Sequence, residues 1–279
     1  MHHDPHWPRA GEWLKSSSEN AIVQVQGVPL NKSITPGHCD EAPAAVRDAL
    51  MYYSLADVEY FSSLDEFGVR DLGDSLDIEP YELPTILLGG DNGVTYHGVH
   101  AMGLPLDRIG LITLDAHFDL RHLDNGLHNG NPISALLRDG MPGKNITQLG
   151  IQSFANSPAY ANVAAEAGIN VVTIDDLYYQ QIVPTLKEAL DGTDVEAFYI
   201  DLDIDVLDRA HCPGAPGARP GGMRPEEVFD FAYFVGLEPR VRAMDIVEFD
   251  PRLDINKVTA LTCAKAMLFF ISGVSKRND

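Results

Sequence analysis

Short apolar runs alternate along this chain with longer segments in which apolar residues recur every three or four positions. Residues two apart share one face of a strand, whereas residues three or four apart share one face of a helix. The short runs predict strands at residues 21–29, 84–91, 109–119, 145–153, 170–175, 197–205 and 241–250. The longer segments predict helices at residues 42–55, from about residue 96, and at 158–168, 183–190, 224–236 and 256–274.

Strands that alternate with helices predict an α/β fold, because neighbouring parallel strands need a crossover connection that is usually a helix. No linker or internal repeat divides the sequence, so we expect one doubly wound domain over residues 1–279. Ligands of such sheets bind beyond the carboxyl ends of the strands. Residues that directly follow the predicted strands are therefore the first candidates for function.

Polar clusters follow three of these strands: residues 89–92 read GGDN, residues 115–119 read DAHFD, and residues 201–205 read DLDID. A single Asp after a strand usually caps the next helix, but a cap needs only one oxygen. Asp203 and Asp205 point the same way in an extended chain, and so do Asp115, His117 and Asp119. Carboxylates that converge repel one another unless a cation neutralises them, and oxygen ligands with one imidazole suit Mn²⁺.

The amino-acid composition indicates which kinds of binding partner the chain disfavours. The chain has 41 acidic and 20 basic side chains and a net charge of −21, which disfavours nucleic acid and anionic membrane surfaces. No apolar run is expected to approach the ~18–20 residues of a membrane span, and residues 1–14 lack the apolar core of a secretory signal. Three distant cysteines, Cys39, Cys212 and Cys263, form neither a disulfide framework nor a zinc motif. We expect a soluble, cytoplasmic protein that binds a small molecule.

Five blocks resemble the ureohydrolase family, which includes arginase, agmatinase and formimidoylglutamase. They read GGDNGVTYHG, LDAHFDLR, HNGNPISALL, YIDLDIDVLD and MDIVEFDP, and they occur in the family's order between residues 89 and 254. The resemblance implies a three-layer α/β/α fold with a central, mostly parallel sheet. It also implies a binuclear Mn²⁺ centre, a substrate with a cationic head group, and a homo-trimer or homo-hexamer.

The same resemblance assigns candidate residues position by position. The matching metal ligands are Asp115, His117, Asp119, Asp203 and Asp205. Glu248 matches the acid that binds the cationic end of the substrate, and Asp119 is also the candidate acceptor of a proton from the nucleophile. Two neighbours depart from the family pattern: Asp201 stands where a small polar residue is usual, and Arg209 where Pro is usual.

Asn92 is the departure that bears most on the metal site. The family's first block normally reads GGDH, and its His binds one metal, whereas this chain reads GGDN. An amide oxygen can bind Mn²⁺, but more weakly than an imidazole. Asn92 is therefore either a weak ligand, which is the interpretation we favour, or no ligand, in which case one of two Mn²⁺ ions is labile or lost.

The substrate tail is less well defined. Residues 114–121, LDAHFDLR, resemble formimidoylglutamases, which tend to have Arg directly after the metal-binding segment. Arg121 could pair with a substrate carboxylate, since its planar fork suits bidentate recognition. This favours hydrolysis of N-formimidoyl-glutamate to glutamate and formamide, a step of histidine degradation, over agmatine or another guanidino substrate.

Proton transfer has two candidates, His122 and His128, of which His128 lies one residue from the family's shuttle position. Asn129 falls on that position and is expected to contact substrate. In the segment 32–50, Ser33, Thr35 and Arg47 could also touch substrate, and a Cys39 nucleophile is disfavoured because no acid pairs with it. The Pro- and Gly-rich residues 212–222 predict a loop at the rim of the site.

Two other classes stay open. A relative that kept the fold and lost a metal would serve as a non-catalytic scaffold, although five unneutralised carboxylates would then be costly. A histone-deacetylase-like amidohydrolase would use one Zn²⁺ and a tandem His pair, which none of the five blocks contains. Metal content separates the three possibilities: two Mn²⁺, one Zn²⁺ or none.

Overall fold

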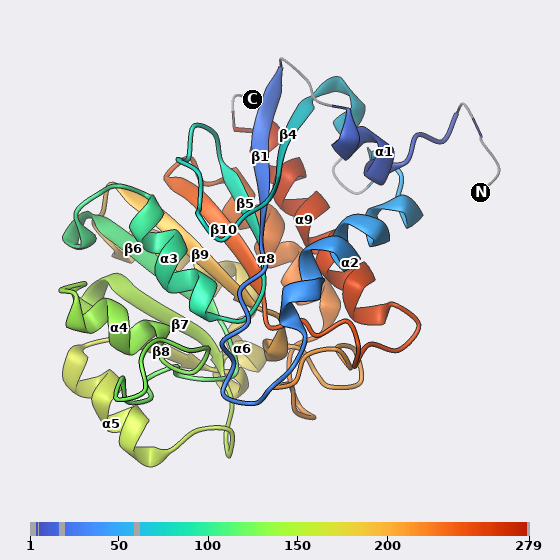
Figure 1. Cartoon of the computed structure of the whole chain (residues 1–279). Coiled ribbons are helices and arrows are strands. Elements are labelled where there is room, and N and C mark those ends of the chain that lie inside the picture. Colours follow the sequence, from blue (N-terminus) through green and yellow to red (C-terminus); the bar gives the residue numbers. More distant parts are fainter. Residues whose placement is uncertain (1–3, 5, 17–19, 59–61, 278–279) are drawn as a thin grey trace.

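Eight parallel strands form the central sheet of this computed structural model, which describes residues 4, 6–16, 20–58 and 62–277 (Figure 1). Their order is β4-β1-β5-β10-β9-β6-β7-β8, and every neighbouring pair is parallel. The strands are β1 (Ala21–Val28), β4 (Gly68–Asp74), β5 (Thr85–Gly89), β6 (Ile109–Leu114), β7 (Ile146–Ile151), β8 (Asn170–Thr173), β9 (Ala197–Asp203) and β10 (Val241–Val247). A separate antiparallel pair joins β2 (Ala56–Asp57) to β3 (Ser62–Ser63).

Strand β4 is the one member of this sheet that the hydrophobic pattern did not predict. It lies at an edge, pairs only with β1, and reads GVRDLGD, with its last three residues exposed. Its acids are paired instead of buried in a core: Asp71 and Asp74 both accept hydrogen bonds from Arg47 of helix α2. An edge strand can therefore be polar and carry no apolar run.

The helices are α1 (Ala10–Lys15), α2 (Ala42–Ala49), α3 (Gly93–Ala101), α4 (Pro132–Arg138), α5 (Pro158–Ala167), α6 (Ile174–Gln180), α7 (Ile182–Gly192), α8 (Pro225–Leu237) and α9 (Val258–Ser275). The six predicted helices are present, but the first is shorter, because α2 ends at Ala49 and a 3-10 turn follows at Leu50–Tyr52. Short helices α1, α4 and α6 were not predicted. Helix α6 begins inside the strand predicted at 170–175, because Thr173 and Asp176 form a capping box.

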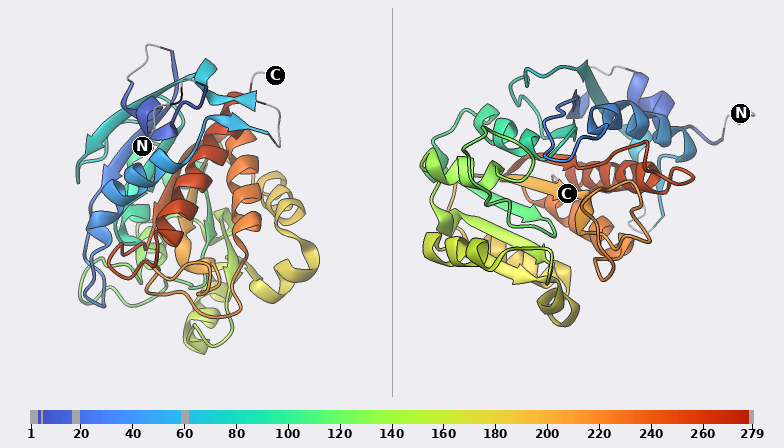
Figure 2. Two further views of the ribbon diagram at one scale, coloured as in Figure 1. Left: turned by 90° about the vertical axis from the view of Figure 1, so that its right-hand side faces the viewer. Right: turned by 60° about the horizontal axis from the view of Figure 1, so that its bottom comes forward.

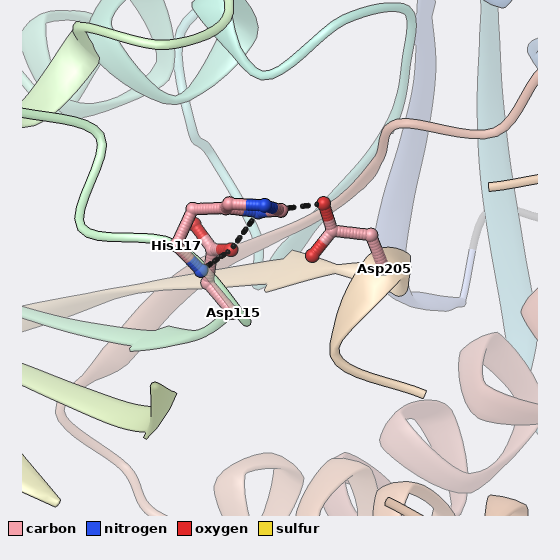
Figure 3. Close-up of side chains that lie close together, drawn as sticks. All are labelled: Asp115, His117 and Asp205. Carbon is pink, nitrogen blue, oxygen red and sulfur yellow. Dashed lines mark hydrogen bonds and ion pairs between the residues drawn. The ribbon is translucent and has the colours of Figure 1, made fainter. Parts of the chain in front are cut away.

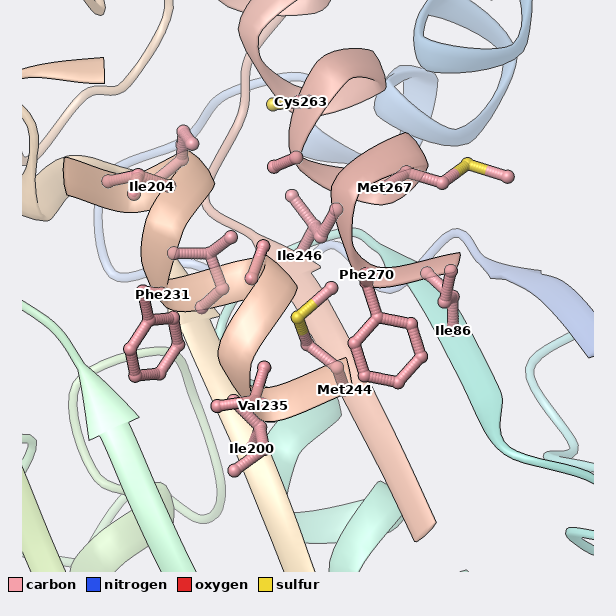
Figure 4. Close-up of a cluster of buried hydrophobic side chains, with 14 of the residues drawn as sticks. Ile86, Ile200, Ile204, Phe231, Val235, Met244, Ile246, Cys263, Met267 and Phe270 are labelled. Carbon is pink, nitrogen blue, oxygen red and sulfur yellow. The ribbon is translucent and has the colours of Figure 1, made fainter. Parts of the chain in front are cut away.

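Helices cover both faces of the sheet, which gives three layers (Figure 2). Strand side chains alternate between the layers, as a period of two requires. Ile200 and Met244 pack with helices α8 and α9, where Phe270 lies (Figure 4), whereas Tyr199 packs on the opposite face with Val94 and Val99 of α3. Helices α1, α2 and α6–α9 pack on the face of the sheet that carries Ile200 and Met244, and helices α3–α5 pack on the face that carries Tyr199. The predicted α/β/α arrangement is confirmed.

Helix α9 corrects one sequence-based expectation. By length and composition alone it could cross a membrane, because its 18 residues have a mean hydropathy of 1.6. Yet 67% of these 18 residues are buried inside the structure. The buried apolar side chains of α9 belong to the same hydrophobic cluster as Ile200 and Met244. The apolar character of α9 is therefore accounted for by packing against the sheet and α8.

Candidate metal centre

The carboxyl ends of four adjacent strands, β5, β10, β9 and β6, carry the polar residues of the site. Asn92 follows β5, Glu248 follows β10, Asp203 ends β9, and Asp115 follows β6. Parallel neighbours end at the same edge of a sheet, so segments far apart in the sequence meet there. All four side chains are buried, with at most 5% of each residue exposed.

Asp115, His117 and Asp205 form the tightest cluster (Figure 3). One potential ligand atom from each lies within 4.8 Å of the other two. His117 Nδ1 is 2.9 Å from Asp205 Oδ2 and 3.5 Å from Asp115 Oδ1. The Asp205 charge, opposed by burial, raises the pKa of His117 to about 12. Two carboxylates and one imidazole at this spacing can hold a divalent cation.

Asp119, which is half-buried, and Asp203, which is buried, bring two further carboxylates to the same cavity. Asp203 Oδ1 accepts a hydrogen bond of 2.8 Å from the Asp205 backbone N–H, which fixes the turn after β9. Asp119 lies in the left-handed region with φ 51°, a conformation that costs free energy for a non-glycine residue. Burial, followed by neighbouring carboxylates, raises the pKa of both well above the usual range. Together, this oxygen-rich set with one imidazole fits Mn²⁺.

The amide of Asn92 lies against this cluster. Its Nδ2 donates a hydrogen bond of 2.7 Å to Asp119 Oδ2, and its Oδ1 lies 2.6 Å from Thr95 Oγ1. Thr95 Oγ1 is also 2.9 Å from Asp245 Oδ2, which accepts a hydrogen bond of 2.7 Å from the Tyr199 hydroxyl. The amide nitrogen of Asn92, and not its oxygen, thus faces the carboxylates.

Glu248 sits apart from the His117 cluster but lines the same cavity. It has φ 61°, and its Oε1 accepts a hydrogen bond of 2.9 Å from the backbone N–H of Asn92. Burial raises the pKa of Glu248 to about 8, against hydrogen bonds from Asn92 and the Asn129 side chain that lower it. A buried carboxylate with few donors of its own can pair with a cationic ligand.

The cavity has a volume of about 400 Å³ and a clear gradient of charge. Buried acids, among them Asp203, Asp205 and Glu248, line its inner part, whereas the exposed residues Arg121 and Arg219 line its mouth. A volume in this range accommodates a small metabolite. The site is thus built to receive a molecule whose positive end enters first.

The sequence model of the Arginase family matches residues 78–272 of this chain. The chain belongs to the arginase family. A formimidoylglutamase of Halalkalibacterium halodurans is 34% identical over 298 residues, which cover 97% of this chain and 93% of the relative. The crystal structure of formimidoylglutamase from Bacillus subtilis superposes with a TM-score of 0.91 at 29% identity, covering 99% of this chain and 94% of the other. That of Trypanosoma cruzi formiminoglutamase with Mn²⁺ has a TM-score of 0.87 at 21% identity, covering 97% and 99%.

These relationships confirm the resemblance and the fold that the five sequence blocks implied. They also confirm the predicted class of enzyme, a hydrolase of the arginase family that cleaves C–N bonds of amidino groups. Mn²⁺ is present in the Trypanosoma cruzi structure.

The structure places the two candidate shuttle histidines of this arginase-family chain outside the cavity that holds the acids. His122 and His128 line a neighbouring cavity of about 560 Å³, which shares Arg121 with the first. The ring nitrogens of His128 are already engaged: Nδ1 accepts from the Gly130 backbone N–H, and Nε2 lies 3.0 Å from Asn131 Nδ2. Both histidines remain candidates for proton transfer from this second cavity.

Residues of the segment 32–50 fall into two groups. Ser33, Thr35 and Cys39 line the acid-bearing cavity, and burial raises the pKa of the Cys39 thiol far above its usual range, so a thiolate nucleophile is disfavoured. Arg47 does not line it; its guanidinium binds Asp71 at 2.8 Å. The prediction that Arg47 could touch substrate is therefore wrong, because it serves to pair α2 with the polar edge strand.

Three residues of the site were missed by sequence reasoning. Thr95 lies one helical turn after Asn92, and Gly217 and Arg219 belong to the predicted rim loop, where only the loop itself was expected. A Thr at i+3 from a candidate ligand was the only available signal for Thr95.

Asp201 does not line the cavity. Burial, followed by the neighbouring Asp245 carboxylate, raises the pKa of Asp201 well above the usual range.

Proposed function

We propose that this chain is a Mn²⁺-dependent formimidoylglutamase, which hydrolyses N-formimidoyl-L-glutamate to glutamate and formamide. The observation that carries the proposal is the charge gradient of one cavity, with buried acids inside and two arginines at its mouth. N-Formimidoyl-glutamate has the matching polarity, because a cationic amidine lies at one end and the side-chain carboxylate at the other. The formimidoylglutamases among its relatives support the same assignment.

We further propose that two Mn²⁺ ions bind at the carboxyl edge of the sheet. The proposed ligands are Asp115, His117, Asp119, Asp203 and Asp205, with Asn92 as a weaker sixth. Bound Mn²⁺ would lower the pKa of water and so supply the nucleophile, while it offsets the mutual repulsion of the carboxylates. The weak amide donor predicts that one ion is held less tightly than the other.

The chain's own residues then orient the substrate and move protons. Glu248 pairs with the amidinium group and turns its electrophilic carbon toward the acids, and Asn129, hydrogen-bonded to Glu248, holds that carboxylate in place. Asp119 accepts a proton from the nucleophile and returns it to the leaving nitrogen, since it lines the same cavity. After product release, His122 or His128 carries a further proton between the site and solvent through the neighbouring cavity. Arg121 binds a substrate carboxylate.

The domain organisation, the compartment and the number of subunits concern the whole molecule. We propose that residues 1–279 act as one domain, that the enzyme works in the cytoplasm, and that three or six copies assemble. Three buried free cysteines fit a reducing compartment. Multi-angle light scattering of the purified protein would measure the number of copies directly.

A product assay tests the proposed reaction. The Mn²⁺-loaded enzyme is incubated separately with N-formimidoyl-L-glutamate, 4-guanidinobutyrate, agmatine and L-arginine, and formamide or urea is followed by NMR. We expect formamide from the first substrate with the highest kcat/KM. Urea from agmatine without formamide would identify an agmatinase instead. No product from any of them at any Mn²⁺ concentration would support the scaffold alternative.

A further inference from the structure

The rim loop 212–222 touches the candidate metal centre through Gly217. A Cβ at this position would lie 1.9 Å from Asp205 Oδ2 and 3.1 Å from His117 Cε1, so only glycine fits there. The backbone of the loop is thereby held against a proposed metal ligand. Arg219 follows two residues later, and its Cα lies within about 7.6 Å of the Gly217 Cα by chain geometry alone.

Arg209 is hydrogen-bonded to several backbone groups of this loop. Its Nη1 donates to the carbonyl oxygens of Ala215 at 3.0 Å, Pro216 at 3.3 Å and Ala218 at 3.5 Å. Its backbone N–H donates to the carbonyl oxygen of Arg219 at 3.1 Å. One half-buried guanidinium thus ties the segment on both sides of Gly217. A proline at position 209 would have neither donor, so this fastening depends on the residue that this chain has there.

Arg219 and Arg121 lack carboxylate partners within the described residues, in a chain with twice as many acids as bases. Arg219 donates only to carbonyl oxygens of its own loop, including Gly217 O at 2.6 Å, and the Arg121 guanidinium makes no hydrogen bond or ion pair there. Other arginines of the described chain do lie within 4.0 Å of Asp or Glu oxygens: Arg47, Arg70, Arg108, Arg138, Arg224, Arg240 and Arg252. Two guanidinium groups without a carboxylate partner among the described residues therefore line one cavity, whose other charged residues are mostly acidic.

We infer that Arg219 binds the side-chain carboxylate of the substrate and that Arg209 is the positioning residue that holds Arg219 at the mouth. This inference rests on the proposed function. In N-formimidoyl-glutamate the α-carboxylate adjoins the amidine, whereas the carbon of the side-chain carboxylate lies three bonds from the α-carbon. With the amidine at buried Glu248, the distal carboxylate extends toward the mouth, where Arg219 is exposed. Arg121 is left for the α-carboxylate, and each planar guanidinium can bind one carboxylate bidentately.

The test compares N-formimidoyl-L-glutamate with N-formimidoyl-L-glutamine, which has the same shape and a neutral distal amide. In Arg219→Gln we expect KM for the glutamate derivative to rise about tenfold or more, with kcat within about twofold, because a charge-assisted contact is lost. KM for the glutamine derivative should not change. Arg224→Gln is the matched control, since the side chain of Arg224, the residue before α8, is 70% exposed and does not line the cavity.

Arg209→Met tests the positioning role. It should raise KM for the glutamate derivative in the same selective way, with Mn²⁺ content unchanged, and Arg209→Lys should restore part of the loss. An equal rise of KM for both derivatives in Arg219→Gln, or no rise at all, would overturn the inference.

A wrong proposed function can be distinguished from a wrong role for Arg219. If the wild type does not hydrolyse N-formimidoyl-glutamate, calorimetric binding of glutarate and butyrate to the Mn²⁺-loaded protein still tests Arg219. Tighter binding of the dicarboxylate in the wild type, lost in Arg219→Gln, supports a dicarboxylate site in an enzyme with another substrate. Equal binding of both probes rejects that site.

Discussion

The side-chain amide nitrogen of Asn92 donates a hydrogen bond of 2.7 Å to Asp119 Oδ2. Two proposed metal ligands are therefore hydrogen-bonded to each other. For Asn92 to bind Mn²⁺, its amide must turn so that Oδ1 replaces Nδ2 beside Asp119. An oxygen next to a carboxylate is repelled unless a cation separates them. Binding of the ion and rotation of the amide are thus one coupled event.

Asn92→His should strengthen the binding of the weaker Mn²⁺ ion. An imidazole nitrogen is a better ligand for Mn²⁺ than an amide oxygen. We expect a several-fold lower Mn²⁺ concentration for half-maximal occupancy, measured by calorimetry and by elemental analysis after dialysis. Asn92→Leu should lose the weaker ion. If the wild type already retains two ions through dialysis and Asn92→His binds no better, the amide is a well-adapted ligand and the proposed weakness is wrong.

Thr95→Val should weaken the same ion without changing the fold. The Thr95 hydroxyl has one hydrogen, so it cannot donate to both Asn92 Oδ1 and Asp245 Oδ2, which lie 2.6 and 2.9 Å away. With the amide turned, Asn92 Nδ2 donates to Thr95 Oγ1, and the hydroxyl donates to Asp245. Valine keeps the volume and removes this acceptor, so Asn92 is no longer held in the metal-binding orientation. We expect a several-fold loss of Mn²⁺ affinity by calorimetry.

The control for Thr95 is Thr185→Val. Thr185 of helix α7 is also buried, its hydroxyl donates to the carbonyl of Gln181 just before the helix, and it does not line the cavity. It should lower the melting temperature by a similar small amount and leave Mn²⁺ binding unchanged. Equal Mn²⁺ affinity in Thr95→Val and wild type would show that the hydroxyl does not orient Asn92.

The sequence predicted the strand ends but not what lies around them. Asp115 and Asp203 were found because buried parallel strands are apolar throughout, so an acid at the end of the run stands out. Strand β4 was missed because an edge strand need not be apolar. Arg219 and Thr95 were missed because their roles come from tertiary contacts: Gly217 against Asp205, and a hydroxyl between Asn92 and Asp245. Spacing within one segment carries no information about such contacts.

Glu248→Gln should abolish most turnover and leave the metal content near that of the wild type. The proposed role of Glu248 is to pair with the amidinium, and glutamine keeps the shape but not the charge. Asp203→Ala should instead lose bound Mn²⁺, because it removes a proposed ligand. Elemental analysis beside kcat/KM separates the two roles. Loss of metal in Glu248→Gln would show that Glu248 is a metal ligand. Full retention of metal in Asp203→Ala would show that Asp203 is not one.

Removal of Mn²⁺ should make the stability of the protein fall as the pH rises from about 5 to 8. Burial raises the pKa of Asp115 to about 7 and that of Glu248 to about 8, from usual values of 3.8 and 4.5. Between the usual and the raised values, the folded metal-free protein binds more protons than the unfolded chain. The free energy of unfolding then decreases with pH, and the raised pKa of His117 acts in the same direction.

Mn²⁺ should reverse this trend, because cations take the place of the protons and bind more tightly as the ligands ionise. The melting temperatures of EDTA-treated and Mn²⁺-loaded protein should therefore lie further apart at pH 8 than at pH 5.5, as scanning calorimetry would measure. Glu248→Gln isolates one contribution, since the metal-free variant should lose less stability over this interval than the metal-free wild type. A difference in melting temperature that stays constant across the interval would mean that the buried acids are not compensated by metal, and the scaffold alternative would then account better for the site.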